Sequence, residues 1–218
     1  SADDTEYCLK PMNCPDTFLF YNSRRRSFRE LPLRISEGGI LHRNELTGAI
    51  NGLFRVRQFM QDDAHIFVTE AQVQDEIAEI LDIVREVYSL FDLKYDFTLS
   101  TRPENFMGES AAWDDAEAAL RASLDRAVPK YAVAEGDGAF YGPKIDIQVT
   151  DGLGRRWQCA TIQLDFQQPI NFDMKYVDSD NLQKRPIVIH RAIFGSFERF
   201  FGILLEHTGG ALPTWLSP

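Results

Sequence analysis

The chain has 218 residues and a formal net charge of −10, and 44% of its residues are hydrophobic against 26% charged. This mixture is typical of a soluble globular protein with a buried core, and it excludes a disordered, collagen-like or coiled-coil chain. The acidic balance disfavours a protein that binds nucleic acid by bulk charge alone.

The cysteines and the apolar runs bear on the compartment. Three cysteines, an odd and low number, argue against a disulfide framework and favour a reducing compartment and a cytoplasmic protein. The longest apolar runs, such as residues 200–205, are far too short to cross a bilayer. The acidic start, residues 1–6, lacks the apolar stretch of a signal peptide. The same features are compatible with an organellar parent.

Four segments carry helix signals. The segment 70–91 carries the best of them, because Thr69 and Gln72 form a capping-box pattern and apolar residues then recur at helical spacing. The others are residues 14–22, which carry the weakest signal, residues 112–124 and residues 193–206.

Strand signals lie between these helices. The predicted strands are residues 31–45, 54–67, 95–100, 144–149 and 156–166. The first two read as a strand pair whose connection is too long for a tight turn, and the last two are joined by a hairpin turn at residues 151–154. Strands in hairpins with helices between them predict an α+β fold with a mostly antiparallel sheet backed by helices.

The predicted strand 54–67 has an unusual face. Alternate residues of a strand share a face, and the odd positions here are Arg55, Arg57, Phe59, Gln61, Asp63 and His65. Arg43 and Glu45 share a face of the partner strand. One interpretation is the wet side of an antiparallel sheet, where charge is ordinary. The other is a binding site, because Phe59 has no reason to face water unless something stacks on it.

The chemistry of this face suggests a ligand. Arginines make permanently charged, bidentate contacts with phosphate or carboxylate groups. A phenyl ring between them suits a base or another flat group. The face is therefore a candidate site for a nucleotide joined to a small acyl group, with the base at Phe59.

Cys14, His65 and His190 are candidate metal ligands, although they lie far apart and show no local zinc-finger spacing. One interpretation is that each is an ordinary core or surface residue. The other is that they meet at a zinc site, where three protein ligands leave an open position for a substrate. Because His65 and Asp63 share the predicted face, such a zinc ion would lie beside a hydrogen-bond acceptor.

Arg24, Arg25, Arg26 and Arg29 form a basic cluster. A solvated loop is one interpretation of it, and a contact with a phosphate backbone is the other.

Seven strings of residues, in this order, carry a resemblance to a known family. They are residues 10–15 (KPMNCP), 42–45 (HRNE), 55–59 (RVRQF), 61–67 (QDDAHIF), 138–145 (GAFYGPKI), 157–166 (WQCATIQLDF) and 190–199 (HRAIFGSFER). Together they closely resemble the catalytic core of the threonyl-tRNA synthetase family of class II aminoacyl-tRNA synthetases. The resemblance covers nearly the whole chain, so residues 1–218 are interpreted as one class II catalytic core.

The resemblance implies a ligase reaction in two steps. Threonine and ATP give threonyl-adenylate and pyrophosphate, and the threonyl group then passes to the 3′-terminal adenosine of the threonine tRNA. It also implies a seven-stranded type of antiparallel sheet flanked by helices, one Zn²⁺ ion, Mg²⁺ with the ATP, and a homodimer in the full-length parent. The first class II motif is expected before residue 1 and the anticodon-binding domain after residue 218, and no membrane contact is expected.

The resemblance further implies roles for single residues. Catalysis would involve Arg43, Arg199 and Lys144; ATP would contact Arg43, Glu45, Arg55, Phe59, Gln158, Thr161 and Arg199; the amino acid would contact Gln61, Asp63, Tyr141 and Gln163; zinc would be bound by Cys14, His65 and His190. Gln158 and Gln163 have opposite strand parity, so both can face the ligand only if a bulge lies between them.

Two positions depart from the family pattern. Asp16 follows the Cys-Pro pair where family members have glycine, and Gly38 stands where they have an aromatic residue. The first difference can alter the helix start beside the metal, and the second can loosen a strand. A zinc ion that demands a hydroxyl group rejects valine but admits serine, so misactivation of serine is expected. The chain has no stretch left over for an editing domain.

Two rival hypotheses remain. A non-catalytic paralogue that binds a nucleotide or RNA is disfavoured by the presence of Arg43, Glu45, Phe59 and Arg199. A sister class II enzyme for serine or proline is disfavoured by the three candidate zinc ligands.

Overall fold

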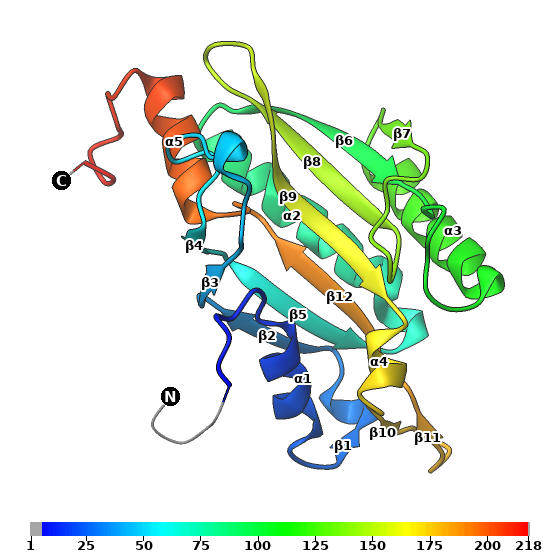
Figure 1. Ribbon diagram of the computed structural model, residues 1–218. Helices are drawn as coiled ribbons and strands as arrows, with labels where there is room; N and C mark the ends of the chain where they lie inside the picture. The colour runs from blue at the N-terminus through cyan, green and yellow to red at the C-terminus, as the bar shows by residue number, and fades with distance from the viewer. Residues whose placement is uncertain (1–5, 218) are drawn as a thin grey trace.

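A seven-stranded sheet forms the centre of the computed structural model, which describes residues 6–217 (Figure 1). Within those residues its strands follow the order β2 (Leu33–Glu37), β5 (Asp63–Val68), β12 (Ile187–Ala192), β9 (Arg156–Asp165), β8 (Lys144–Thr150), β6 (Lys94–Ser100) and β7 (Ala132–Ala134). Every neighbouring pair is antiparallel except β6 and β7. The predicted α+β fold with an antiparallel sheet is therefore confirmed.

Two long helices cover one face of the sheet, behind the strands in the view of Figure 1. They are α2 (Val73–Leu90) and α3 (Ser110–Ala127). The predicted helix over residues 70–91 starts as the short 3₁₀ turn η3 (Glu70–Gln72), where Thr69 and Gln72 form the expected capping box, and continues as α2 from Val73. Its apolar stripe packs on the sheet in the main core, which includes Ile77, Leu81, Val84, Ile145, Ile147, Ile162 and Ile189.

The opposite face of the sheet receives the helix α1 (Cys14–Asn22), whose bounds match the weakest helix prediction. The register of β5 and β12 shows why this face is separate. Val188 lies opposite Phe67 and both pack under α1, whereas the next pair, Ile189 and Ile66, points into the main core. Because successive residues of a strand alternate in direction, each strand supplies two different environments.

The predicted helix over residues 193–206 begins later than the apolar pattern suggests. The helix α5 is Phe197–Thr208, because Gly195 adopts a φ of 76° and the Ser196 hydroxyl accepts from the backbone N–H of Arg199 as an N-cap. A left-handed residue cannot continue a helix, so the chain turns before α5 starts.

The predicted strand pair over residues 31–45 and 54–67 is wrong as a continuous hairpin. Each strand breaks in two, and the outer halves β3 (Ile40–His42) and β4 (Gln58–Met60) form a small sheet of their own. The break in the second strand falls at Asp62, whose carboxylate accepts from two backbone N–H groups of the segment before α5. Tertiary hydrogen bonds thus override the alternating pattern.

The remaining elements lie mostly beside α1 or in the loops. They are β1 (Arg26–Ser27), η1 (Phe28–Glu30), η2 (Thr47–Ala49), α4 (Gln168–Asn171), β10 (Tyr176–Val177) and β11 (Gln183–Lys184). Arg26 is only 3% exposed and donates to the carbonyls of Phe20 and Tyr21, while Arg24 pairs with Glu30. This half of the basic cluster is therefore structural. Among the helices of residues 6–217, none combines the length and the apolar character needed to cross a bilayer.

The predicted turn between β8 and β9 is confirmed and is held by Asp151. One carboxylate oxygen accepts from the backbone N–H groups of Leu153 and Arg155, and the other from the side chains of Arg155 and Trp157. Burial on its own disfavours the charged form, but these hydrogen bonds outweigh it and lower the pKa of Asp151 to about 2.

The lowered pKa predicts an acid-sensitive stability. The contribution of Asp151 is fully present above its unfolded pKa of about 4 and is lost as the pH falls towards its folded value, and the shift is worth about 2 kcal/mol. Asp151→Asn should therefore destabilise the protein at pH 7 and flatten the loss of stability between pH values of about 5 and 2. Urea denaturation across that range measures both effects. Asp96→Asn, at an exposed carboxylate beside Arg156, should leave the acid limb unchanged.

Candidate active site

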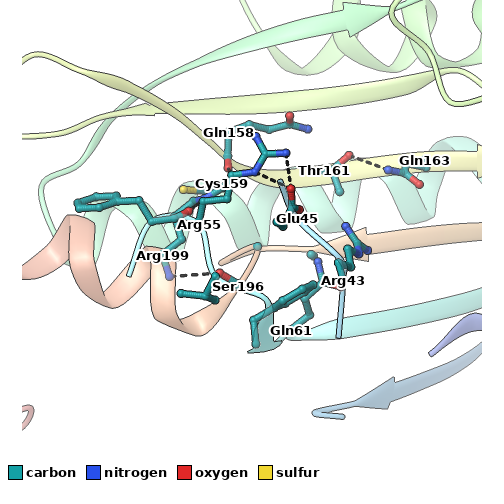
Figure 2. Close-up of a pocket in the computed structure, with 15 residues that line it drawn as sticks. Arg43, Glu45, Arg55, Gln61, Gln158, Cys159, Thr161, Gln163, Ser196 and Arg199 are labelled. Carbon is teal, nitrogen blue, oxygen red and sulfur yellow. Dashed lines mark hydrogen bonds and ion pairs between the residues drawn. The ribbon is translucent and has the colours of Figure 1, made fainter. Parts of the chain in front are cut away.

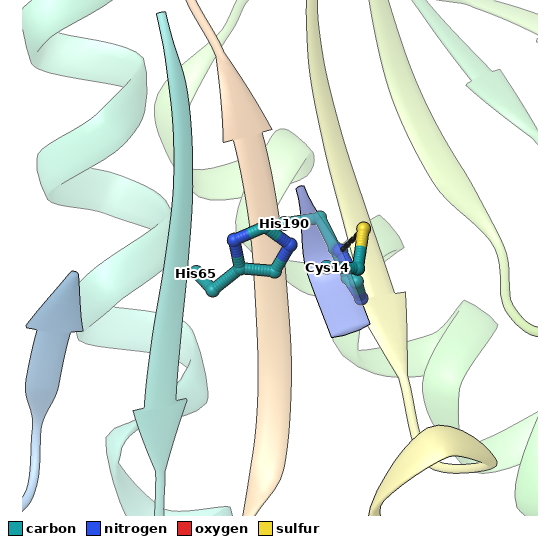
Figure 3. Close-up of side chains that lie close together, drawn as sticks. All are labelled: Cys14, His65 and His190. Carbon is teal, nitrogen blue, oxygen red and sulfur yellow. Dashed lines mark hydrogen bonds between the residues drawn. The ribbon is translucent and has the colours of Figure 1, made fainter. Parts of the chain in front are cut away.

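Cys14, His65 and His190 converge on the face of the sheet that α1 covers (Figure 3). His65 of β5 and His190 of β12 are direct cross-strand neighbours, and Cys14 is the first residue of α1. Their potential ligand atoms all lie within 4.8 Å of one another. The convergence predicted from the sequence is therefore found.

The surroundings of this cluster fit a metal ion. Asp165 accepts from His190 Nε2 at 2.9 Å, which leaves Nδ1 facing the Cys14 thiol at 3.7 Å. The edge of the Phe18 ring packs against both imidazoles. His65 Nε2 is buried and, among the described residues, has no hydrogen-bond partner. An orphaned buried nitrogen beside a thiol and a second imidazole fits the donor set of zinc.

The two imidazoles differ in their protonation. Burial lowers the pKa of His65 to about 2, so this ring is neutral and keeps a lone pair for a metal. Burial acts in the same direction on His190, but its hydrogen bonds to Asp165 and Cys14 outweigh it and raise the pKa of His190 above its ordinary value. A metal ion bound at this cluster would therefore displace a proton from His190.

A cavity of about 410 Å³, here called the histidine lobe, opens above this cluster. Its lining includes Cys14, Phe18, Arg43, Gln61, Asp63, Phe140, Tyr141, Thr161, Gln163, Asp165 and His190. The Asp63 carboxylate accepts from Asn13 at 3.3 Å, and the Tyr141 hydroxyl donates to the Gln163 side-chain oxygen. Burial raises the pKa of both Asp63 and Tyr141.

A second cavity, of about 260 Å³ and here called the arginine lobe, lies beside it (Figure 2). Its lining includes Arg43, Glu45, Phe54, Arg55, Phe59, Gln61, Gln158, Cys159, Thr161, Gln163, Ser196 and Arg199. All seven residues expected to contact the nucleotide thus line one cavity. The guanidinium of Arg43 lies over the Phe59 ring at 5.2 Å, which gives the lobe a cation–aromatic pair.

Hydrogen bonds hold the arginine lobe in shape. Arg199 donates from Nε to the carbonyl of Phe54 and from Nη1 to the carbonyl of Gln158, both at 2.8 Å. Arg55 and Glu45 form an ion pair at 2.8 Å, as Figure 2 shows. Two backbone carbonyls therefore hold the Arg199 guanidinium in place. The ion pair of Arg55 and Glu45 is half-exposed, so each side chain can leave the other and bind a ligand instead.

The two lobes form one continuous cleft. Arg43, Gln61, Thr161, Gln163 and Ala192 line both of them. Arg43 therefore lies at the boundary between the two lobes, where a ligand in one lobe would contact a ligand in the other. A permanently charged, planar donor at that junction suits two anionic groups that must approach each other.

The predicted bulge in β9 is confirmed. Thr161 lies opposite Asp146 of β8, but Gln158, three residues earlier, lies opposite Gln148, only two residues away. The extra residue reverses the direction of the side chains that precede it. Gln158 and Gln163 consequently line the same lobe despite their opposite parity.

Lys144 is placed differently from the other candidate residues. In the described part of the chain it lines neither lobe, and its ammonium group pairs with the buried Asp146 at 2.7 Å. Its position on β8 is opposite Gln163, in the same cross-strand row as His190 and His65. Its role in catalysis stays a prediction.

Other lining residues carried no independent sequence signal. Phe54, Cys159 and Ser196 of the arginine lobe and Phe140 and Asp165 of the histidine lobe received no role. Four of them lie inside the seven strings that resemble the known family. Their closeness in sequence to residues with an expected role is therefore the only sequence feature that indicates a place in the site. Burial raises the pKa of the Cys159 thiol to about 12, so this thiol is protonated and inert.

The two departures from the family pattern have simple settings. Asp16 lies in the first turn of α1 and pairs with Lys10 at 3.2 Å, a favourable position for an acid. A side chain at Gly38 would enter open space, whereas a Cβ at Gly39 would lie 2.5 Å from the Asn13 side chain. The glycine that the fold requires here is Gly39.

The comparisons agree with this geometry. Residues 1–208 match the family described as tRNA synthetase class II core domain (G, H, P, S and T). The chain therefore belongs to the class II tRNA synthetase core family.

Within that family the chain is similar to threonine–tRNA ligases. It is 53% identical to the enzyme of Desulfatibacillum aliphaticivorans and 54% identical to that of Thermotoga maritima, over 99% of its own length and 34% of theirs. It also superposes on the crystal structure of the RNA binding domain of threonyl-tRNA synthetase from Cryptosporidium parvum Iowa II with a TM-score of 0.97 at 48% identity, over 100% of this chain and 55% of that one. The chain thus spans about a third of the length of the curated relatives.

Proposed function

We propose that the chain is the catalytic core of a threonine–tRNA ligase, which converts threonine and ATP to threonyl-adenylate and pyrophosphate and passes the threonyl group to the 3′ end of threonine tRNA. The observation that carries the proposal is the continuous cleft, in which an arginine lobe meets, at Arg43, a second lobe that lies over a cluster of one thiol and two imidazoles.

The arginine lobe is the proposed site for ATP. Phe59 and Arg199 offer faces for adenine, Glu45 accepts from its amino group, and Arg55 holds the terminal phosphates together with Mg²⁺. Gln158 and Thr161 remain for the ribose side of the nucleotide. The Arg55–Glu45 ion pair opens in this proposal, because Arg55 exchanges the carboxylate for phosphate groups and Glu45 exchanges the guanidinium for the amino group of adenine.

The histidine lobe is the proposed site for threonine. Cys14, His65 and His190 would hold a zinc ion, which would supply Lewis-acid binding of the amine and hydroxyl groups of the amino acid. Asp63 accepts from the hydroxyl group, and Gln61, Tyr141 and Gln163 surround the amine. Asp165 keeps the ring of His190 in place through its hydrogen bond to Nε2.

The first step is then a displacement at phosphorus. An oxygen of the threonine carboxylate attacks the α-phosphorus of ATP, the new oxygen–phosphorus bond forms, and pyrophosphate leaves. Arg43 contacts both the carboxylate and the α-phosphate, so it reduces their repulsion and stabilises the charge that develops between them. In the second step the terminal ribose hydroxyl of the tRNA attacks the carbonyl carbon, and AMP leaves.

The proposed site discriminates by chemistry rather than by size. Valine matches threonine in shape but lacks the hydroxyl group, and a site that binds a hydroxyl group leaves its own polar groups unpaired with valine. Serine has the hydroxyl group and lacks one methyl group, a difference of about 1–3 kcal/mol. Activation of serine at a reduced rate is therefore expected.

Metal content tests the histidine lobe directly. The purified protein should contain one zinc per chain, and Cys14→Ser should lose most of it because a hydroxyl group is a poor zinc ligand. Elemental analysis measures the ratio. Cys8→Ser removes an exposed thiol and should keep the metal. Equal zinc contents in the two variants would contradict the ligand assignment.

ATP–pyrophosphate exchange tests the activity, with the protein purified at its full natural length. Threonine should support exchange above valine by more than about 100-fold, and serine should fall between them. Exchange that does not depend on threonine would remove the proposed function, and binding of RNA without binding of ATP or threonine would favour a non-catalytic paralogue instead.

Asp63→Ala should lose threonine activation while ATP binding survives, because Asp63 lines the histidine lobe alone. We expect kcat/KM for threonine to fall by about 100-fold, the size associated with loss of one buried partner of a hydroxyl group. Exchange kinetics and calorimetric titration with ATP separate the two effects. Glu37→Ala, at the position opposite Asp63 on β2, is the matched control. Equal losses of ATP and threonine binding would contradict this role.

Three further predictions accompany the proposal. A homodimer of the full-length protein, a cytoplasmic location and the absence of membrane contact stay predictions. The free thiols of Cys8, Cys14 and Cys159 are consistent with a reducing compartment.

A further inference from the structure

Asp62 joins two segments that lie far apart in the sequence. Its Oδ2 accepts from the backbone N–H of Ile193 at 2.7 Å, and its Oδ1 accepts from the backbone N–H of Phe194 at 3.0 Å. Arg191 adds a donor to Oδ2 at 3.2 Å and another bond to the Asp62 carbonyl at 3.1 Å. Among the described residues Asp62 lines neither lobe of the cleft.

The neighbours of Asp62 reinforce the same junction. The backbone N–H of Met60 donates to both carboxylate oxygens of Glu198, at 3.1 and 3.2 Å. Gln61 forms an isolated antiparallel bridge with Ser196. Three consecutive residues of one segment are therefore bonded to the turn and first helical residues of the other, with the Asp62 carboxylate making the most contacts.

Each bonded segment carries groups of the proposed active site. The first leads from Phe59 through Gln61 to Asp63 and therefore passes from the arginine lobe to the histidine lobe. The second leads from His190 at the histidine lobe to Arg199 at the arginine lobe. In each segment the residues bonded at Asp62 lie between the residues of one lobe and the residues of the other. The geometry of this junction therefore sets the distance between the lobes and their relative orientation.

We propose that Asp62 is a positioning residue for the ligation step, which fixes the arginine lobe and the histidine lobe relative to each other. This inference rests on the proposed function, because it concerns the approach of an amino-acid carboxylate to the α-phosphate of ATP. Asp62 touches neither substrate and acts through the backbone of residues 193–194 and through the segment that carries Gln61 and Asp63.

Only a carboxylate suits this junction. Two successive backbone N–H groups and a guanidinium group all require acceptors, and a carboxylate offers two acceptor oxygens and no donor. An amide of the same shape keeps one oxygen but turns an NH₂ group towards the other N–H. Asp62→Asn therefore breaks one side of the junction while it changes the volume hardly at all.

The expected kinetic effect is specific. Each lobe keeps its own lining in the variant, so ATP and threonine should bind almost as before. The reacting groups, however, are held by different lobes, and a displacement of about 1 Å between them can cost about 100-fold in rate. Asp62→Asn should therefore lower kcat for exchange by about 100-fold and change either dissociation constant by less than about threefold.

Glu76→Gln supplies the matched control. Glu76 is also a buried carboxylate with an arginine partner, since Arg34 donates to its two oxygens at 2.9 and 2.6 Å. It lies on α2, away from both lobes. This variant should lose a comparable amount of thermal stability and retain its kcat.

The experiment combines three measurements on the protein at full natural length: exchange kinetics, calorimetric binding of ATP and of threonine, and hydrogen exchange of residues 193–199. The expected result is a fall in kcat for Asp62→Asn alone, with both affinities kept and faster hydrogen exchange in that segment. A kcat equal to that of Glu76→Gln overturns the proposal. A loss of ATP affinity that matches the fall in kcat also overturns it, because the effect then belongs to one lobe.

Two further outcomes are distinguishable. If Asp62→Asn does not fold, Asp62→Glu keeps both oxygens one methylene further out, and its kcat should fall while both affinities stay; an unchanged kcat again overturns the proposal. If the unaltered protein shows no threonine-dependent exchange, the proposed function fails, and hydrogen exchange alone decides the role of Asp62. Unchanged protection of residues 193–199 in the variant then refutes the junction itself.

Discussion

The register between β5 and β12 is the constraint on which the rest of the site depends. It places His65 directly opposite His190 on one face, while the neighbouring pair of Ile66 and Ile189 points into the core behind the sheet. A slip of β12 by one residue would turn His190 into that core and Ile189 to the opposite face, and the two imidazoles would no longer be neighbours. Apolar burial on the face covered by α2 and α3 therefore fixes the position of the polar groups on the other face. The hydrophobic core and the proposed metal site are two results of the same pairing.

The cleft face combines groups that the sheet holds rigidly with groups that remain adjustable. Arg199 is fixed by two backbone carbonyls, and His190 is fixed by Asp165. Arg55 and Glu45, by contrast, satisfy each other near the surface. Rigid groups set the geometry for the reacting atoms, and the surface pair gives way to a ligand at little cost. The proposed reaction needs both properties, since catalysis of this kind consists mostly of positioning and charge stabilisation.

Much of the fold and part of the site can be predicted from the sequence, and the failures have a common cause. The helical segment formed by η3 and α2 follows from its apolar spacing and capping box, and the bulge in β9 follows from the opposite parity of two glutamines. The long hairpin and the early start of α5 are wrong, because both predictions extend a periodic pattern across a place where the local backbone interrupts it. The Asp62 carboxylate interrupts the strand by accepting from a distant backbone, and the positive φ of Gly195 delays the helix. A carboxylate that accepts from a distant backbone group has no signature in spacing.

The extra residue in β9 affects which parts of the cleft a single substitution in this strand can alter. Because the irregularity reverses the direction of the side chains that precede it, Gln158 lines the arginine lobe alone, whereas Gln163, after the irregularity, lines both lobes. Under the proposed function, a substitution at Gln158 changes the lining of the nucleotide site alone, whereas a substitution at Thr161 or Gln163 changes the lining of both sites. The irregularity therefore separates a part of the strand that belongs to one substrate from a part that both substrates share.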